Sequence, residues 1–133
     1  QDTTRKKQKS GIIELMEWNP LTTLEELTHI KENSTQRPVI IYKHSTRCGI
    51  SSMVLNRLER SWKPDEMQAA DIYFLDLIRH RDISQAVAET FNIHHESPQL
   101  LLISNGKCTY DASHMGISYA TIKEKLSVAS KPA

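Results

Sequence analysis

The sequence predicts an α/β fold in which helices flank a central mixed sheet of four strands. Short β-branched runs alternate with segments whose apolar residues recur at helical spacing, and this alternation is typical of a βαβ unit. Asn105-Gly106 separates two further strand-like runs and favours φ > 0, so it predicts a tight hairpin that adds antiparallel strands. A chain of 133 residues is long enough for one domain with one core.

A polar leader precedes the predicted domain. Residues 1–11 carry several basic side chains and show no apolar period, so we expect a flexible leader there and a single domain over residues 12–130. Thr22 or Thr23 can cap the first helix. We expect helices at residues 24–31, 48–62, 82–91 and 118–129, and strands at residues 39–43, 72–78, 100–104 and 107–110.

Composition excludes several classes of function. The formal net charge is +1 with both signs mixed, so the chain shows no electrostatic footprint for nucleic acid or for an anionic membrane. The longest apolar runs, such as residues 100–103, are far shorter than the roughly 20 residues that span a bilayer. Cys48 and Cys108 are the only cysteines, which favours a reducing compartment. We therefore expect a cytoplasmic protein, and a targeting segment ahead of Gln1 stays open.

Cys48 lies at the junction between a predicted strand and a predicted helix. The first turn of a helix offers unpaired N–H groups and the positive end of the helix dipole, and both favour a thiolate. We expect the sulfur to accept from the N–H of Ile50 or Ser51, and the Ser51 hydroxyl to add a donor. Arg47, Lys43 and, when protonated, His44 supply positive charge nearby, although His44 could instead simply satisfy a hydrogen bond. Cys48 is thus a candidate nucleophile.

Ser51 determines how a reaction at Cys48 must end. In a Cys-x-x-Cys protein the second thiol attacks the mixed disulfide from within the molecule. A serine hydroxyl is far too weak an acid to do the same. An external thiol must therefore complete the cycle.

Four short blocks of the sequence occur in a characteristic order and spacing. They are Lys43-His44-Ser45-Thr46-x-Cys48-x-Ile50-Ser51, Arg81-Asp82-Ile83-Ser84, His95-Glu96-Ser97-Pro98-Gln99 and Ser113-His114-x-x-Ile117. Together they closely resemble the YtxJ family of monothiol bacilliredoxins, from about Trp18 to Ile122. The resemblance implies a thioredoxin-like fold, which the predicted order of elements also suits. One departure is visible, because that family usually carries proline where this chain has Gly49.

The resemblance also implies an activity and a set of site residues. Cys48 would remove bacillithiol, or another low-molecular-weight thiol, from mixed disulfides on client proteins, with that thiol as co-substrate and no bound cofactor. Ser97-Pro98 matches the cis-proline of thioredoxin-like domains, although the sequence alone also permits a trans proline at the start of a strand. The implied substrate-binding surface comprises Thr46, Ser97, Pro98, Gln99 and His114, with Arg47 beside them.

Three other features receive ordinary interpretations. The predicted hairpin pairs Ile103 with Cys108, about 17 Å along the strand from Pro98. We therefore interpret Cys108 as a half-buried strand residue and not as a resolving thiol. The histidines lack the spacing of a metal motif, so we expect no metal site. Residues 79–81 form a small basic cluster, either a solvated start of a helix or a contact for an acidic thiol.

Two alternative functions stay open at this stage. An arsenate-reductase-like enzyme also uses a cysteine on a thioredoxin-like fold, but no block here supplies the expected downstream arginine. A non-catalytic interaction or redox-sensing module needs only one modifiable cysteine and a partner held near Ser97-Pro98. For the leading hypothesis, the expected partners are S-thiolated client proteins and a small thiol, with neither nucleic acid nor membrane.

Overall fold

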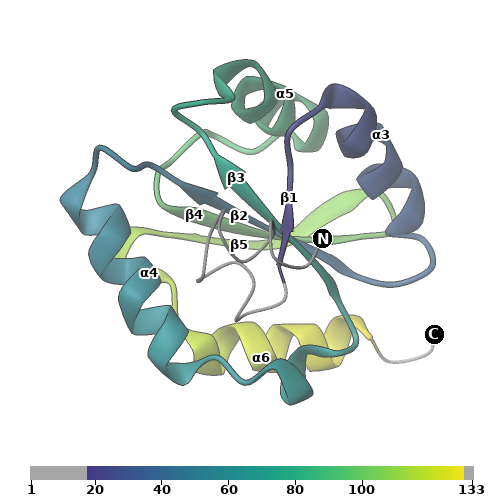
Figure 1. The fold of residues 1–133 in the computed structure, drawn as a ribbon. Helices are drawn as coiled ribbons and strands as arrows, with labels where there is room; N and C mark the ends of the chain where they lie inside the picture. The colour runs from purple at the N-terminus through teal and green to yellow at the C-terminus, as the bar shows by residue number, and fades with distance from the viewer. Residues whose placement is uncertain (1–17, 131–133) are drawn as a thin grey trace, which may run out of the picture.

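A five-stranded sheet forms the centre of the computed structural model, which describes residues 18–130 (Figure 1). The predicted leader over residues 1–11 lies outside the described residues. The strand order is β1-β3-β2-β4-β5; β1, β3 and β2 run parallel, β4 pairs antiparallel with β2, and β5 pairs antiparallel with β4. The strands are β1 (Asn19–Pro20), β2 (Val39–His44), β3 (Asp71–Asp76), β4 (Gln99–Ser104) and β5 (Lys107–Ser113).

The predicted mixed sheet is confirmed, with one strand more than the expected four. The additional strand, β1, has only two residues, and one of them is Pro20. A strand this short has no alternation of apolar residues, and proline is depleted in strands, so the sequence pattern could not reveal it. β1 pairs with the outer edge of β3 and places the start of the described chain there.

Among residues 18–130, helices cover both faces of the sheet (Figure 1). Their packing defines two apolar cores, one between the sheet and α3 and α5, the other between the sheet and α4 and α6. None of the helices within residues 18–130 is both long and apolar enough to cross a membrane. The helices are α3 (Leu24–Asn33), α4 (Gly49–Ser61), α5 (Arg81–Phe91) and α6 (Tyr119–Ala129), with short 3-10 turns η1 (Pro64–Met67) and η2 (His114–Gly116).

The central strand β2 is buried along its whole length. Successive side chains of a strand point to opposite faces. Ile41 accordingly packs in the core beneath α3 and α5, while Ile40 and Tyr42 pack in the core beneath α4 and α6. A continuous apolar run is what such a doubly covered strand requires, and residues 39–42 supply it. The end of β2 is therefore held rigidly where the chain turns toward Cys48.

Local sequence signals set the ends of the first helix and of the hairpin. Thr23 accepts a hydrogen bond from the N–H of Glu26, whose carboxylate accepts one from the N–H of Thr23 in return, so α3 begins with a capping box. Asn105 and Gly106 have φ of 52° and 76° and form the predicted two-residue turn. The turn docks on the end of α3, where Ser34 Oγ accepts from the N–H of Gly106 at 2.8 Å.

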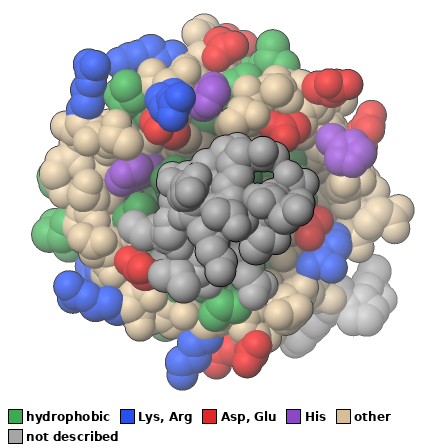
Figure 2. Space-filling view, viewed as in Figure 1, with side chains coloured by type: hydrophobic (Ala, Val, Ile, Leu, Met, Phe, Trp, Pro, Cys, Tyr) green, Lys and Arg blue, Asp and Glu red, His purple; other side chains and the backbone are tan. Residues whose placement is uncertain are grey.

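Charged side chains do not separate by sign on the face shown in Figure 2. Lys and Arg side chains are interspersed there with Asp and Glu side chains. The net charge of +1 is therefore not concentrated in one basic surface on this face. On this face, electrostatic recognition would therefore depend on individual charged side chains and not on one extended charged surface.

Candidate active site

Cys48 occupies the N-cap position of α4, immediately after the loop that follows β2. Its backbone is extended, with φ −115° and ψ 119°, and its carbonyl accepts the first helical hydrogen bond from the N–H of Ser52 at 3.2 Å. The thiol is partly exposed and forms no disulfide. Cys48 therefore combines access to solvent with the positive end of a helix dipole.

The expected hydrogen bonds to the Cys48 sulfur are not formed. The Cys48 side chain accepts no capping hydrogen bond at the start of α4. The Ser51 hydroxyl instead lies 2.8 Å from Nδ1 of His44 and accepts the N–H of Ser45 at 3.0 Å. Ser51 is fully buried, and the imidazole of His44 and the N–H of Ser45 satisfy its hydroxyl, as a buried polar group requires. Its role here is to hold the loop after β2 against α4.

His44 is buried, and of the two roles predicted for it the structure shows the hydrogen bond. The imidazole is 7% exposed and packs against the ring of Phe74. Burial lowers the pKa of His44 below its ordinary value, and the charge of Asp76 only partly opposes this. Near neutral pH, His44 therefore acts on the site through its hydrogen bond to Ser51.

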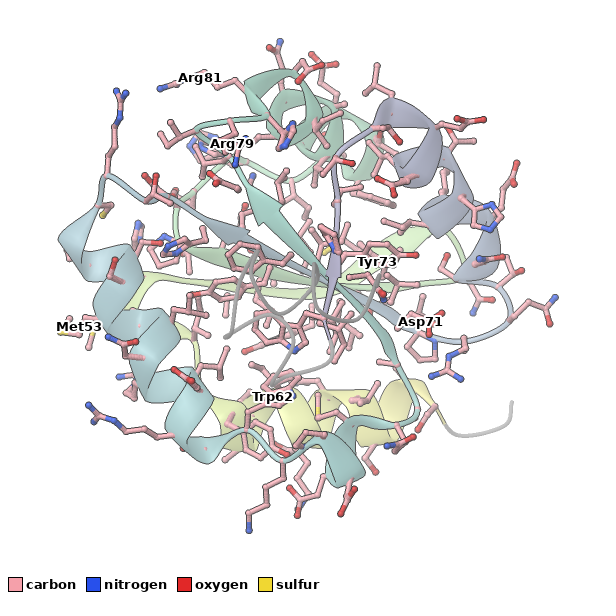
Figure 3. The ribbon with its side chains drawn as sticks, in the orientation of Figure 1. Met53, Trp62, Asp71, Tyr73, Arg79 and Arg81 are labelled. Atoms are coloured by element: carbon pink, nitrogen blue, oxygen red, sulfur yellow. The ribbon has the colours of Figure 1, made fainter. Side chains whose placement is uncertain are left out.

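The ends of β2 and β3 bring a second loop to the edge where Cys48 lies. His44 is the register partner of Asp76, and the N–H of Leu77 donates to the carbonyl of His44 at 3.0 Å. Arg79 follows on this second loop and Arg81 lies at the start of α5 (Figure 3), so both come after β3 at the edge of the sheet where β2 leads to Cys48. Both side chains are exposed, and no carboxylate of residues 18–130 forms an ion pair with them.

The predicted substrate-binding residues divide into exposed and buried groups. Thr46 and Arg47 are exposed beside Cys48, and Ile50 is 48% exposed. Pro98 is buried, and the Ser97–Pro98 bond is cis, as predicted. Because β4 runs antiparallel to β2, its first residues lie beside the last residues of β2, which brings Ser97-Pro98 to the same edge of the sheet.

Gln99 does not belong to the exposed surface on which we placed it. Its side chain is 1% exposed and donates to the carbonyl of His94 at 3.0 Å, while its oxygen accepts from the N–H of Glu96 at 3.3 Å. Because side chains alternate between the two faces of a strand, Gln99 at the first position of β4 points to the face beneath α5, together with Leu101 and Ile103. Gln99 therefore supports the segment that precedes Pro98 and cannot meet a substrate directly.

His114 lies beside the same segment. Its backbone has φ 53°, an uncommon value for a residue with a side chain, and its N–H donates to the carbonyl of Pro98 at 3.0 Å. Its imidazole Nε2 lies 3.5 Å from Glu96, which also faces His94 at 3.7 Å. His114 is thus exposed and bonded to Pro98 through its backbone, and its role in substrate binding stays a prediction.

Two residues have contacts that sequence reasoning did not predict: Lys43, which we expected only to supply positive charge near Cys48, and His95. Lys43 is 1% exposed on the central strand, and its Nζ lies 2.7 Å from Nδ1 of His95. Both residues belong to blocks that carried the resemblance, but a lysine at the end of a strand ordinarily extends into solvent. Only the three-dimensional structure shows that this one is enclosed.

Cys108 is confirmed as a half-buried strand residue. It pairs with Ile103, as predicted, and its Sγ donates to the carbonyl of Tyr110 at 3.3 Å. Burial raises the pKa of the Cys108 thiol to about 11, so very little thiolate forms near neutral pH. Cys108 lies in the hairpin close to its turn, at the opposite end of β4 from Pro98.

Apolar side chains are exposed on the helices beside Cys48. Ile50 and Met53 on α4, and Met115 on η2, are each about half exposed. Met53 projects from the outer side of α4 (Figure 3). Arg57 links the two elements, since its guanidinium donates to the carbonyl of Met115 at 3.2 Å. These side chains extend the accessible surface near the thiol.

A partly exposed cysteine at a helix N-terminus, on a sheet flanked by helices and at the same edge as the Ser97-Pro98 segment, is the arrangement of a thiol oxidoreductase of the thioredoxin fold. Comparison with known families agrees, because the profile of the monothiol bacilliredoxin BrxC matches residues 19–122. The chain belongs to that family.

Solved structures show the same fold. The chain is similar to a protein described by its thioredoxin fold, with 25% identity and a TM-score of 0.67 over 80% of this chain and 90% of the other. It is also similar to thioredoxin from Malassezia sympodialis, at 14% identity and a TM-score of 0.66, over 86% and 91% of the two chains. Thioredoxin from Fasciola hepatica gives 14% identity and a TM-score of 0.62, over 84% and 98%.

Proposed function

We propose that this protein is a monothiol exchange enzyme that removes bacillithiol, or another low-molecular-weight thiol, from mixed disulfides on client proteins. The observation that carries the proposal is the pairing of an accessible Cys48 with a buried Ser51 whose hydroxyl is already bonded to His44 and Ser45. Membership of the monothiol bacilliredoxin family supports it. A reducing compartment such as the cytoplasm suits a cycle that consumes a free thiol.

The proposed reaction consists of two thiol–disulfide exchanges. The Cys48 thiolate attacks the sulfur of the small thiol in the client's mixed disulfide; a new disulfide forms between Cys48 and the small thiol, and the client cysteine leaves as a thiolate. A second small thiol, as its thiolate, then attacks the small-thiol sulfur on Cys48. Cys48 leaves as a thiolate, and the two small thiols leave as their symmetrical disulfide. Each step breaks one disulfide and forms another, so the client cysteine is freed as the second small thiol passes from thiol to disulfide.

Intact-mass measurement tests this proposal. A client protein carrying one bacillithiol mixed disulfide, and in parallel one cysteine mixed disulfide, is incubated with the enzyme. We expect the client to lose the adduct while Cys48 gains it, and free thiol to restore the enzyme to its original mass. The Cys48→Ser variant should be inactive, whereas Cys108→Ser should match the wild type. Loss of the client adduct without its appearance on Cys48 would contradict the mechanism.

The same experiment separates the non-catalytic alternative. A redox-sensing module would gain the adduct on Cys48 but would not release it to excess free thiol at a useful rate. Repeated turnover of client by a small amount of enzyme therefore supports the exchange enzyme. A single stoichiometric transfer, after which the reaction stops despite excess thiol, would favour the sensor.

We also propose that the small thiol is anionic. Arg47, Arg79 and Arg81 are exposed at the edge of the sheet where Cys48 lies, and the last two lack a carboxylate partner among residues 18–130. Guanidinium groups bind carboxylates in a bidentate manner. The carboxylates of a small thiol would therefore be attracted to the side of Cys48 nearest α5.

A further inference from the structure

Lys43 is an unusual residue for the interior of this protein. It lies on β2 between Leu75 of β3 and Gln99 of β4, and its side chain shares the face of the sheet with Ile41, beneath α5. An ammonium group in such a place costs considerable free energy unless it is paired. No carboxylate of residues 18–130 forms an ion pair with it; its short contact is the one with His95 Nδ1, at 2.7 Å.

The partner of Lys43 belongs to the segment His94–Ser97, which has no regular secondary structure and directly precedes Pro98. Gln99, the cross-strand partner of Lys43, bonds to the same segment through both ends of its amide. Two adjacent buried polar side chains of the sheet therefore reach the same four residues. In Figure 1 the connection from α5 to β4 descends at the edge of the sheet where α4 begins.

We propose that Lys43 and His95 form a latch that holds the segment His94–Ser97 in place for docking of the client protein, which makes Lys43 a positioning residue for the exchange reaction. The inference rests on the proposed function, because it concerns the client of that same site. It assigns a role to a side chain that touches neither Cys48 nor, by its burial, the substrate.

The hydrogen bond between Lys43 and His95 forms only in certain protonation states, which follow from the donors and acceptors of the two side chains. A lysine ammonium has three donors and no acceptor, so Nδ1 of His95 must accept and its ring must be neutral, with its proton on Nε2. A protonated His95 would present an N–H to the ammonium and repel it. Ser84 Oγ, at 3.4 Å from the same Nδ1, is a second potential donor to a neutral ring. Acidification should therefore open the latch.

The surroundings of Lys43 and His95 shift both pKa values so that the contact between them is kept near neutral pH. Burial and, after it, the charge of Lys43 lower the pKa of His95; His94 acts in the same direction, and Glu96 opposes them. Burial lowers the pKa of Lys43 to about 8, again opposed by Glu96. Glu96 is itself shared between His94 and His114. Both partners thus have the required protonation state between the lowered pKa of His95 and about pH 8.

Steady-state kinetics on a client mixed disulfide tests the latch. Lys43→Met and His95→Ala should raise KM for the client by roughly tenfold, the effect expected from losing one charge-assisted hydrogen bond, with little change in kcat. The rate at which iodoacetamide alkylates Cys48 should stay the same, because the thiol is not touched. His95→Gln should restore KM, since an amide oxygen accepts from Lys43, and should remove the rise in KM at acidic pH. Lys63→Met and His29→Gln serve as matched controls on exposed residues.

A second measurement follows the mobility of the segment His94–Ser97 in the absence of any reaction. Backbone hydrogen exchange of residues 94–97 should accelerate in Lys43→Met and in His95→Ala, and ¹⁵N spectra of the wild type should show His95 as the neutral Nε2–H tautomer. Unchanged KM together with unchanged exchange in folded variants would overturn the latch. In contrast, failure of the wild type to transfer any adduct to Cys48 would overturn the proposed function and leave the exchange result to decide on the latch.

Discussion

At the scale of single residues, Gly49 is the residue that directly follows the candidate nucleophile Cys48. It is the first residue of α4, follows an extended Cys48, and has open space within 4 Å of where a Cβ would lie. A proline fits such a position, because its fixed φ suits the first helical turn and the residue before it must be extended. The glycine is therefore not required by the backbone conformation here.

We predict that Gly49→Pro stabilises the protein. The unfolded chain loses freedom at this position while the folded chain keeps its conformation, so the free energy of unfolding should rise by about 0.4–1 kcal/mol. Urea denaturation monitored by tryptophan fluorescence measures this, with Gly49→Ala as the control for removing glycine alone. A lower denaturation midpoint for Gly49→Pro would show that the Gly49 backbone has a conformation the structure does not reveal.

Sequence reasoning at this scale placed Cys48 correctly at the start of a helix, but it did not predict the hydrogen bonds of the neighbouring Ser51. A cysteine between a strand and a helix is visible as a pattern, and so is a proline before a strand. The hydrogen-bond partner of the Ser51 hydroxyl depends on how deeply His44 is buried, and that depends on α4 packing over β2. The burial of Gln99 and Lys43 depends on packing against the other face of the sheet, beneath α5. Such contacts between distant segments have no local signature.

At the scale of elements, the parallel pair β2 and β3 brings two loops with different chemistry to one edge. One loop carries the nucleophile Cys48, and the other carries Arg79 and leads to Arg81 at the start of α5. The sequence predicted both strands and both helices, with bounds within a few residues of those observed. It could not decide whether residues 79–81 were merely solvated or were placed beside the thiol, since that depends on strand order.

We predict that Arg79 and Arg81 select for charge in the small thiol. In the Arg79→Gln, Arg81→Gln double variant, reduction of the Cys48 mixed disulfide by mercaptosuccinate should slow by roughly three- to tenfold, as for the loss of favourable charge pairs at a surface. Reduction by uncharged 2-mercaptoethanol should be unchanged, and reduction by cationic cysteamine should accelerate slightly.

Stopped-flow measurement of the second-order rate constants at low and high salt checks this prediction. Comparing variant with wild type for each thiol cancels the differences in thiol basicity. Arg60→Gln, near the far end of α4, is the control for losing an arginine elsewhere. Equal slowing with all three thiols would mean that the arginines act on the structure of the site and not on the charge of the co-substrate.

At the scale of the whole molecule, the buried ammonium of Lys43 should make stability depend on pH. Its pKa of about 8 in the folded protein lies below the ordinary 10.5. Below pH 8 Lys43 is charged in both states, so its burial is a constant cost. Between about 8 and 10.5 the unfolded chain binds more protons, so this residue contributes a free energy of unfolding that rises with pH.

We predict that Lys43→Met is more stable than the wild type at pH 7, by about 1–3 kcal/mol, because an apolar side chain replaces a buried charge without an ion pair. The difference should shrink as the pH rises from 8 to 10. Urea midpoints of both proteins across this range provide the measurement. A difference that stays constant with pH would show that Lys43 keeps its proton in the folded protein. Greater stability with weaker client docking would be a trade of stability for function.

The far end of the sheet from Cys48 has a practical consequence for anyone who modifies this protein. Loop tips usually tolerate inserted tags and new chain ends. Here the Asn105-Gly106 turn is bound through two backbone N–H groups to Ser34, which is also the residue that ends α3. An insertion in the turn would disturb a helix, a hairpin and the register of β4 together. The turn therefore connects the hairpin to α3, and labels are better attached elsewhere.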